Sequence, residues 1–320
     1  MAEVTTSMKL PVRNHVYQFH LFDSLRWNFL THRDDDVVVV TYAKSGTTWM
    51  QGIVANLIFL GNELPAPLLE LSPWIERRGA PLELVLTGLE RQTHRRVIKT
   101  HLPLDGFPYD QRVKYVYVGR DVRDVFMSQW NHYRNFTEAA LTAFNTSPGR
   151  VGPELPRCPD DIGEVWRNWM TRSWFEWETE GYPWCSPLSH PQLWWDYRHL
   201  PNILFVHYAD LLADFEGEVR RVADFLQIDV PPAAWPRIVH NCTLAEMRAA
   251  AARQEAVRPA LSAVLKGGEE TFFYKGTNGR WRDVLSSEEL ALYDQAAQRE
   301  LTPDCRYWLE NGRQGTLNPG

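Results

Sequence analysis

The stretch that decides the fold is VVVVTYAKSGTTWMQGIVANLIFL, residues 37–60. Its four consecutive valines, Val37–Val40, indicate a strand buried on both faces, as parallel sheets require. From Thr48 onward, apolar residues recur at steps of three and four, which predicts a helix with one apolar face. A strand, a short polar loop and a helix N-terminus together make a site for an anion, because free backbone N–H groups and the positive end of the helix dipole face the loop.

The loop between strand and helix adds polar side chains to this anion site. Lys44 supplies a full positive charge, and hydroxyl donors come from Ser45, Thr47 and Thr48. The pattern does not match the Walker phosphate loop, because the lysine precedes Gly46 and the first glycine is absent. A second interpretation stays open at this point, in which the loop only caps a buried helix and Lys44 is solvated.

Length and composition bound the class of protein. With 320 residues, the chain has room for one large α/β domain or two smaller ones. A formal net charge of −6 argues against bulk binding to nucleic acid or to an anionic membrane, but allows a local positive site. The four scattered cysteines fit free thiols in a reducing compartment. With no secretory signal and no apolar run near the roughly 20 residues of a membrane span, we expect a cytoplasmic protein.

A second segment with candidate functional side chains is RRVIKTHLP, residues 95–103. Val97 and Ile98 end a short strand, and Pro103 prevents its continuation. Lys99 and His101 are two residues apart, so an extended backbone puts both side chains on one face. Ligands of open α/β sheets bind at the carboxyl ends of the strands, although a lone histidine after a strand is more often structural.

A third segment is VKYVYVGRDVRDVFMSQWNHY, residues 113–133. It predicts a strand that ends at Arg120 and a helix that begins at Asp121, with Ser128 two turns along that helix. A guanidinium and a hydroxyl suit a phosphate monoester. Taken alone, such a pair is more often a surface arginine and a serine near a helix cap.

Together the motifs resemble one family, the cytosolic sulfotransferases. TYAKSGTTW resembles their 5′-phosphosulfate-binding loop TYPKSGTTW and departs from it only at Ala43. KTHLP resembles the segment that carries their catalytic histidine. Their 3′-phosphate motif YVxRxxxDxxxSxxxxY is matched by Tyr117, Val118, Arg120, Asp124, Ser128 and Tyr133.

The C-terminal segment FFYKGTNGRWRDVL, residues 272–285, resembles the family signature RKGxxGDWKxxF. Lys275, Gly276, Gly279 and Trp281 match it. Tyr274 stands where the family has an arginine that contacts the 3′-phosphate, and whether Arg280 or Arg282 compensates is open. The usual dimer motif is not kept, which leaves the oligomeric state open.

The resemblance implies one α/β sulfotransferase domain over residues 1–320, with a central parallel sheet flanked by helices. Residues 1–36 either line the acceptor pocket or are plain packing. The implied donor is 3′-phosphoadenosine 5′-phosphosulfate (PAPS), with adenosine 3′,5′-bisphosphate (PAP) as product and no metal. The implied acceptor is a hydroxyl or amine of a small molecule, which the aromatic composition predicts to be apolar or aromatic.

In the implied mechanism His101 is the general base, Lys44 stabilises the leaving phosphate and Lys99 steadies the sulfonyl oxygens. The implied nucleotide-binding residues are Lys44, Ser45, Gly46, Thr47, Thr48, Trp49, Arg120, Ser128, Trp184, Thr243, Lys275 and Gly276. Two rival functions are a kinase or NTPase, which needs a Walker lysine and a magnesium carboxylate, and a nucleotide-binding module without turnover. An intact His101 beside Lys99 argues against a nucleotide-binding module without turnover.

Three further elements are expected from pattern alone. Residues 139–160 carry turn signals and predict a mobile lid. Residues 162–180 predict one helix dense in tryptophan, and residues 209–225 predict one amphipathic helix.

Overall fold

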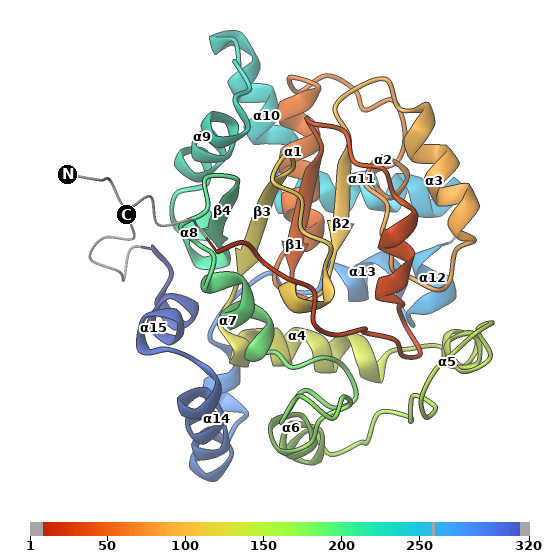
Figure 1. The fold of residues 1–320 in the computed structure, drawn as a ribbon, viewed down its shortest axis with the longest axis vertical. Helices are drawn as coiled ribbons and strands as arrows, with labels where there is room; N and C mark the ends of the chain where they lie inside the picture. Colours follow the sequence, from red (N-terminus) through yellow and green to blue (C-terminus); the bar gives the residue numbers. More distant parts are fainter. Residues whose placement is uncertain (1–8, 258–259, 314–320) are drawn as a thin grey trace.

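A four-stranded parallel sheet forms the centre of the molecule (Figure 1). The computed structural model describes residues 9–257 and 260–313, so the first eight residues of the predicted N-terminal segment lie outside the described residues. The strands are β1 (Val37–Thr41), β2 (Val97–Thr100), β3 (Lys114–Gly119) and β4 (Ile203–His207), in the order β2-β1-β3-β4. This confirms the predicted fold class, a parallel sheet flanked by helices.

The two faces of the sheet pack into separate cores. Val38 and Val40 belong to the larger core, while Val37 and Val39 belong to the smaller one, as the two-residue period of a strand requires. The helices are α1 (Thr47–Ile58), α2 (Leu68–Leu71), α3 (Leu82–Arg91), α4 (Val122–Arg134), α5 (Glu138–Asn145), α6 (Ile162–Thr171), α7 (Ser189–Trp195), α8 (Tyr208–Ala213), α9 (Phe215–Leu226), α10 (Trp235–Asn241), α11 (Leu244–Val257), α12 (Leu261–Val264), α13 (Gly268–Phe272), α14 (Ser287–Glu300) and α15 (Pro303–Asn311). Helices α1, α9 and α10 cover the smaller core, and α4, α6, α7, α14 and α15 cover the larger one.

Strand order and register bring the three chemical segments together. β1 lies between β2 and β3 in the sheet. The chain leaves β1 for β2 on one side of it and then crosses to β3 on the other side, so the strand order reverses at β1. Val40 pairs with Thr100 and Thr41 pairs with Val118, which aligns the carboxyl ends of the three strands. Such a switch point is where open α/β sheets bind ligands. The loop after β1, the residues after β2 and the start of α4 therefore meet there.

Two predicted helices are shorter than expected. The helix predicted over residues 162–180 ends at Thr171, because its last carbonyls accept from elsewhere: Gly181 N–H donates to Trp169, and Tyr182 N–H donates to Arg172. The helix predicted over residues 209–225 is split into α8 and α9 at Asp214, whose side chain caps α9. In the first case hydrogen bonds from residues beyond the helix override the sequence periodicity, and in the second a local cap at Asp214 does so.

The predicted lid, residues 139–160, contains one ordered helix, α5, followed by irregular chain. Tyr133 O–H donates to the Pro156 carbonyl at 2.6 Å and Asn145 exchanges two hydrogen bonds with Leu155, which tie the irregular part to α4 and α5. The mobility predicted for this segment stays a prediction.

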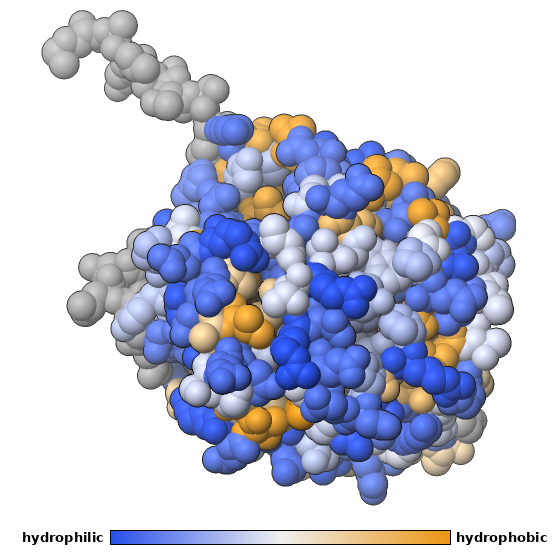
Figure 2. Space-filling view, turned by 90° about the horizontal axis from the view of Figure 1, so that it is seen from below, coloured by the Kyte–Doolittle hydropathy of each residue, from blue (hydrophilic) through white to orange (hydrophobic). Residues whose placement is uncertain are grey.

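The described part of the N-terminal segment crosses the sheet (Figure 1). Its aromatic side chains Tyr17, Phe19, Phe22 and Trp27 are buried in the larger core. The face of the molecule shown in Figure 2 carries small, separate hydrophobic patches among hydrophilic residues. Among residues 9–257 and 260–313, no helix combines the length and apolar character that a membrane crossing requires.

The contact between β3 and α15 gives a stability prediction. A Cβ built on Gly119 lies 2.3 Å from the Trp308 ring, which is 2 % exposed and has little room to move. We expect Gly119→Ala to destabilise the fold by about 1–3 kcal/mol, the usual cost of overpacking a core. Gly88→Ala, in exposed helix α3 with open space around it, is the matched control and should stabilise by up to about 1 kcal/mol. Urea unfolding midpoints measure both, and equal midpoints for the two variants would contradict the packing assigned to Gly119.

Candidate active site

The loop after β1 curls around the N-terminus of α1. Two of its residues have left-handed backbone, Gly46 with φ 108° and Lys44 with φ 70°. Positive φ is uncommon for a residue other than glycine, and such strain concentrates at functional sites. No side chain of the described residues caps α1, so the N–H groups of its first turn, at Thr47, Thr48 and Trp49, are available to an anion. This is the geometry predicted for an anion-binding loop.

Gly46 is required here for a second reason. A Cβ on Gly46 would lie 2.9 Å from the ring of Tyr208, the first residue of α8. The Tyr208 hydroxyl donates to the Gly276 carbonyl at 3.0 Å, and the Arg120 guanidinium lies 4.2 Å from the ring centroid. Tyr208 thus joins three motifs that are far apart in the sequence. The sequence analysis missed it, since no local pattern distinguishes a tyrosine at the end of a strand.

His101 directly follows β2 and is 8 % exposed. Its Nδ1 lies 2.8 Å from the Thr41 carbonyl oxygen, which can only accept, so we assign the proton to Nδ1. The other nitrogen, Nε2, then carries the free lone pair. The Glu76 carboxylate fixes the backbone beside the ring by accepting from the His101 N–H at 2.7 Å. The histidine is therefore held in the tautomer that a general base needs.

Thr41 also connects the histidine to the anion loop. Its hydroxyl lies 2.6 Å from the Thr47 hydroxyl and 3.1 Å from His101 Nδ1. The Thr47 hydroxyl, predicted as a donor to the anion, is thus engaged inside the protein. The Thr48 side chain remains on the partly exposed side of the helix start.

Lys44 and Lys99 are partly buried amines close to one another. Burial, followed by the positive charges of Lys99 and Arg120, lowers the pKa of Lys44 to about 7. Burial and the charge of Arg77 lower the pKa of Lys99 to about 8, against the opposing effect of Glu76. Within the described residues, none of Lys44, Lys99 and Arg120 forms an ion pair with a carboxylate. The site therefore carries positive charge that no described carboxylate pairs directly, although Glu76 acts on Lys99 and Asp124 acts on Arg120 from a distance.

The same environment keeps His101 neutral. Burial lowers its pKa well below the ordinary value, and the charge of Lys99 lowers it further, while the hydrogen bond to Thr41 opposes the shift. A neutral imidazole with a free Nε2 can accept a proton at physiological pH.

Arg120 directly follows β3 and is 6 % exposed, and its hydrogen bonds to described residues all go to uncharged oxygens. Its nitrogens donate to Asn278 Oδ1 at 3.0 Å, to the Thr277 carbonyl at 3.1 Å and to the Lys44 carbonyl at 3.2 Å. Ser128 lies on the same helix that Arg120 precedes, and its hydroxyl has no protein partner among the described residues. Arg120 thus links the anion loop to the C-terminal loop.

The C-terminal loop, residues 273–279, is anchored on α4 and exposes Lys275. Gly279 N–H donates to Asp124 at 2.6 Å, and burial raises the pKa of that carboxyl to about 6. Lys275 is exposed, with its amine over the ring of Tyr274. By contrast, the charge of Arg280 bears on Arg120, and Arg280 Nε is buried with no partner among the described residues. Of the two arginines left open by the sequence, Arg280 is the one whose charge lowers the pKa of Arg120.

Trp49 and Thr243 come together, and Trp184 lies apart from them. Trp49 Nε1 donates to the Cys242 carbonyl at 2.8 Å, next to Thr243, whose hydroxyl accepts from Glu246 N–H at the start of α11. Trp184 packs in the larger core against Tyr133, on the other face of the sheet from Trp49. The adenine contact predicted for Trp184 stays a prediction, and this geometry gives it no support.

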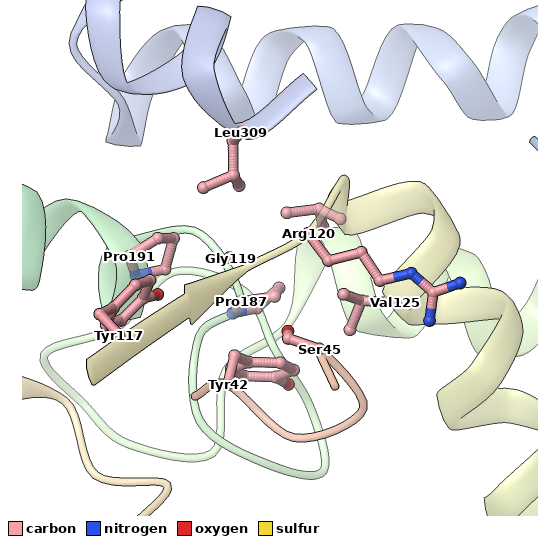
Figure 3. A pocket seen from close by; sticks show the side chains of 10 residues that line it. Tyr42, Ser45, Tyr117, Gly119, Arg120, Val125, Pro187, Pro191 and Leu309 are labelled. Carbon is pink, nitrogen blue, oxygen red and sulfur yellow. The ribbon is translucent and has the colours of Figure 1, made fainter. Parts of the chain in front are cut away.

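Ser45 turns into the protein. It is 2 % exposed and lines a small cavity of about 10 Å³, together with Tyr42, Gly119 and Arg120 (Figure 3). That volume holds about one water molecule, so the cavity is too small for a nucleotide.

The sequence comparisons agree with this geometry. The family model described as "Sulfotransferase domain" matches residues 34–304. The chain belongs to the sulfotransferase family. It is 32 % identical over 320 aligned positions to a glycolipid sulfotransferase of Mycobacterium bovis, covering 94 % of this chain and 95 % of that protein. It is 28 % identical to sulfotransferase 1A1 of Rattus norvegicus, covering 85 % and 86 %. The predicted membership of the sulfotransferase family and the predicted enzyme class, a PAPS-dependent sulfotransferase, are confirmed.

A solved structure shares the fold of this sulfotransferase. The crystal structure of mouse sulfotransferase SULT7A1 complexed with PAP aligns with a TM-score of 0.64 at 22 % identity, covering 88 % of this chain and 90 % of that one. At this identity, the likeness shows the fold alone. Among the described residues of this sulfotransferase, no group of three His, Cys, Asp or Glu side chains is arranged to hold a metal ion.

The lowered pKa of Lys44 gives a prediction for nucleotide binding. An anion beside Lys44 raises its pKa above the free value of about 7, so PAP should bind with uptake of protons at pH 7–8. Affinity should be constant below that free pKa and should fall as the pH rises through it toward the bound pKa. Calorimetry at pH 7.5 in buffers of different ionisation enthalpy measures the uptake.

The control is Lys44→Met, which keeps an unbranched apolar chain and removes the amine. It should take up fewer protons than wild type under the same conditions. Equal uptake by the two proteins would mean that Lys44 is already protonated in the free enzyme.

Proposed function

We propose that this sulfotransferase moves the sulfuryl group of PAPS to a sugar hydroxyl of a glycolipid-type acceptor. The observation that carries the proposal is the neutral His101, with a free Nε2, beside the Lys44 and Lys99 amines at the carboxyl ends of adjacent strands. A base next to uncompensated positive charge suits a reaction that takes a proton from a neutral nucleophile and leaves negative charge on an anion.

The reaction follows from these roles. The acceptor hydroxyl gives its proton to His101 Nε2 while its oxygen forms a bond to sulfur. The bond between sulfur and the bridging oxygen of the 5′-phosphate breaks, and its electron pair stays on that phosphate, which leaves as PAP. The His101 proton then passes to solvent.

Charge builds on the bridging oxygen in the transition state, which is where Lys44 and the free N–H groups of α1 have their effect. Groups that interact more strongly with the transition state than with the ground state raise kcat. Lys99 is assigned to the sulfonyl oxygens. Its amine lies 4.6 Å from the centroid of Trp74, whose ring in turn contacts His101 at 4.8 Å.

At the other end of the donor, we assign the 3′-phosphate to Arg120, Ser128 and Arg280. Arg120 now donates to three neutral oxygens, and a phosphate is a stronger acceptor than any of them. Arg280 has a buried Nε that lacks a partner among the described residues, and it stands close enough for its charge to act on Arg120. Exposed Lys275 becomes a secondary contact.

The acceptor class is drawn from the relatives and from the walls of the site. Two relatives, from Mycobacterium bovis and Mycobacterium tuberculosis, are named glycolipid sulfotransferases. Aromatic rings of the N-terminal segment lead to the base: Phe19 packs on Phe22 at 4.1 Å, and Phe22 lies 6.1 Å from Trp74. Phe19 and Phe22 are themselves buried, so these rings form an apolar layer behind Trp74, and the prediction that the N-terminal segment lines the acceptor pocket stays a prediction.

The acceptor proposal is tested by supplying labelled PAPS with octyl β-glucoside, 2-naphthol or hexylamine. We expect label in the glucoside at a higher kcat/KM than in the phenol or the amine. A higher kcat/KM with 2-naphthol would favour an apolar or aromatic small molecule as the acceptor. Absence of transfer to all three compounds would contradict the proposed glycolipid-type acceptor. A cytoplasmic location stays a prediction.

The base is tested by His101→Ala. Loss of a general base should lower kcat by about 10²–10⁴-fold, while PAP affinity changes little. His199→Ala, at an exposed histidine, is the matched control and should behave as wild type. Turnover of His101→Ala near that of wild type would show that another group takes the proton.

The 3′-phosphate assignment is tested with two ligands that differ only in that group, PAP and adenosine 5′-monophosphate. A hydrogen bond to a charged group contributes about 1.5–3 kcal/mol, so Arg120→Ala and Arg280→Ala should each weaken PAP binding by about tenfold or more. Both should leave the monophosphate nearly unaffected, and Lys275→Ala should cost less than either. Equal losses for the two ligands would mean that these arginines hold the loop and not the phosphate.

A further inference from the structure

A histidine that no motif covers contacts the lysine of the anion loop. His132 lies on α4, one turn beyond Ser128 and on the same side of the helix. Its Nδ1 is 3.2 Å from Lys44 Nζ. The family pattern that identified Arg120, Ser128 and Tyr133 passes over this position, so the sequence analysis gave it no role.

The direction of this hydrogen bond follows from the charges around it. Burial lowers the pKa of His132 well below its ordinary value, and the positive charges of Lys44 and Lys99 lower it further. A neutral imidazole has one N–H donor and one accepting nitrogen, and an ammonium can only donate, so the nitrogen that faces the Lys44 ammonium must be the accepting one. Lys44 therefore donates to His132 Nδ1, and the imidazole proton is on Nε2.

Aromatic side chains complete the surroundings of the amine. Lys44 Nζ lies 4.9 Å from the ring centroid of Phe272, the last residue of α13. The His132 ring packs edge-on against Phe272 and Phe136, at 6.0 and 5.3 Å. The ammonium thus has one neutral acceptor and one aromatic face.

A neutral partner differs from a carboxylate in its consequences for catalysis. A carboxylate would hold the ammonium in an ion pair and would repel the phosphates of the donor. One hydrogen bond to a neutral nitrogen orients the amine. It is weaker than a hydrogen bond to an anionic oxygen, so the ammonium can donate to the bridging oxygen of the donor instead when that oxygen gains negative charge.

We propose that His132 is a positioning residue for sulfuryl transfer, which orients the Lys44 ammonium and maintains its protonation until the bridging oxygen gains charge. The proposal rests on the proposed function. His132 acts through Lys44 and needs no contact with the donor or the acceptor.

Two variants separate orientation from packing. His132→Phe keeps a ring against Phe136 and Phe272 and removes the acceptor. His132→Asn loses the ring and keeps an acceptor oxygen near the place of Nδ1. With PAPS and octyl β-glucoside, we expect His132→Phe to lower kcat about tenfold with PAP affinity within about threefold of wild type, and His132→Asn to recover most of kcat.

A second readout needs no acceptor. Because the hydrogen bond favours the charged amine, its loss in His132→Phe should lower the pKa of free Lys44 below about 7. The variant should then take up more protons than wild type when it binds PAP at pH 7. A purely structural role would leave this uptake unchanged.

The proposal is overturned if His132→Phe keeps wild-type kcat and proton uptake, or if His132→Asn is as impaired as His132→Phe in both. Failure of the wild-type enzyme to transfer sulfuryl to any acceptor would overturn the proposed function instead, since the proton uptake of the variants can still be compared.

Discussion

The structure depends on positive charge that is held in place without a directly paired carboxylate among the described residues. Lys44, Lys99 and Arg120 meet where three parallel strands end, and none of them forms an ion pair among the described residues. Burying charge without a partner costs free energy, which here appears as the lowered pKa of both lysines. Two buried cores, one on each face of the sheet, supply the stability that allows the chain to keep such a site. The donor's phosphates provide the missing charge.

The same arrangement sets the acid–base chemistry. Burial, and after it the positive charges that await the nucleotide, lower the pKa of His101 and His132 and keep both neutral, although their orientations come from different partners. The Thr41 carbonyl accepts a hydrogen bond from His101 Nδ1–H, which leaves the Nε2 lone pair free, whereas His132 Nδ1 accepts from Lys44. Two histidines of the same charge thus differ in function because one faces a backbone acceptor and the other a donor.

Sequence reasoning reached the parts that local pattern encodes. The valine run, KTHLP and the strand before Arg120 identified three strands and the residues that follow them, because a strand end is a local event. Thr41, Glu76, His132 and Tyr208 were missed since their roles depend on pairing between segments, such as the register of Val40 with Thr100. The helix predicted to reach Glu180 ends at Thr171 for the same reason: distant N–H groups, of Gly181 and Tyr182, satisfy its last carbonyls. Trp184 was assigned because the resembling family has an adenine-contacting aromatic near this point. That contact stays a prediction, and Trp184 itself packs in the larger core.

The central claim, that uncompensated charge at the strand ends awaits the donor's phosphates, is tested most directly by thermal unfolding with PAP and with adenosine. A ligand at about 100 times its Kd stabilises the native state by about 2.7 kcal/mol, which raises Tm by several degrees in a protein of this size. The account predicts this rise for PAP and no measurable rise for adenosine at the same concentration, because adenosine brings the base and sugar without the charges. An equal rise with both ligands would contradict it.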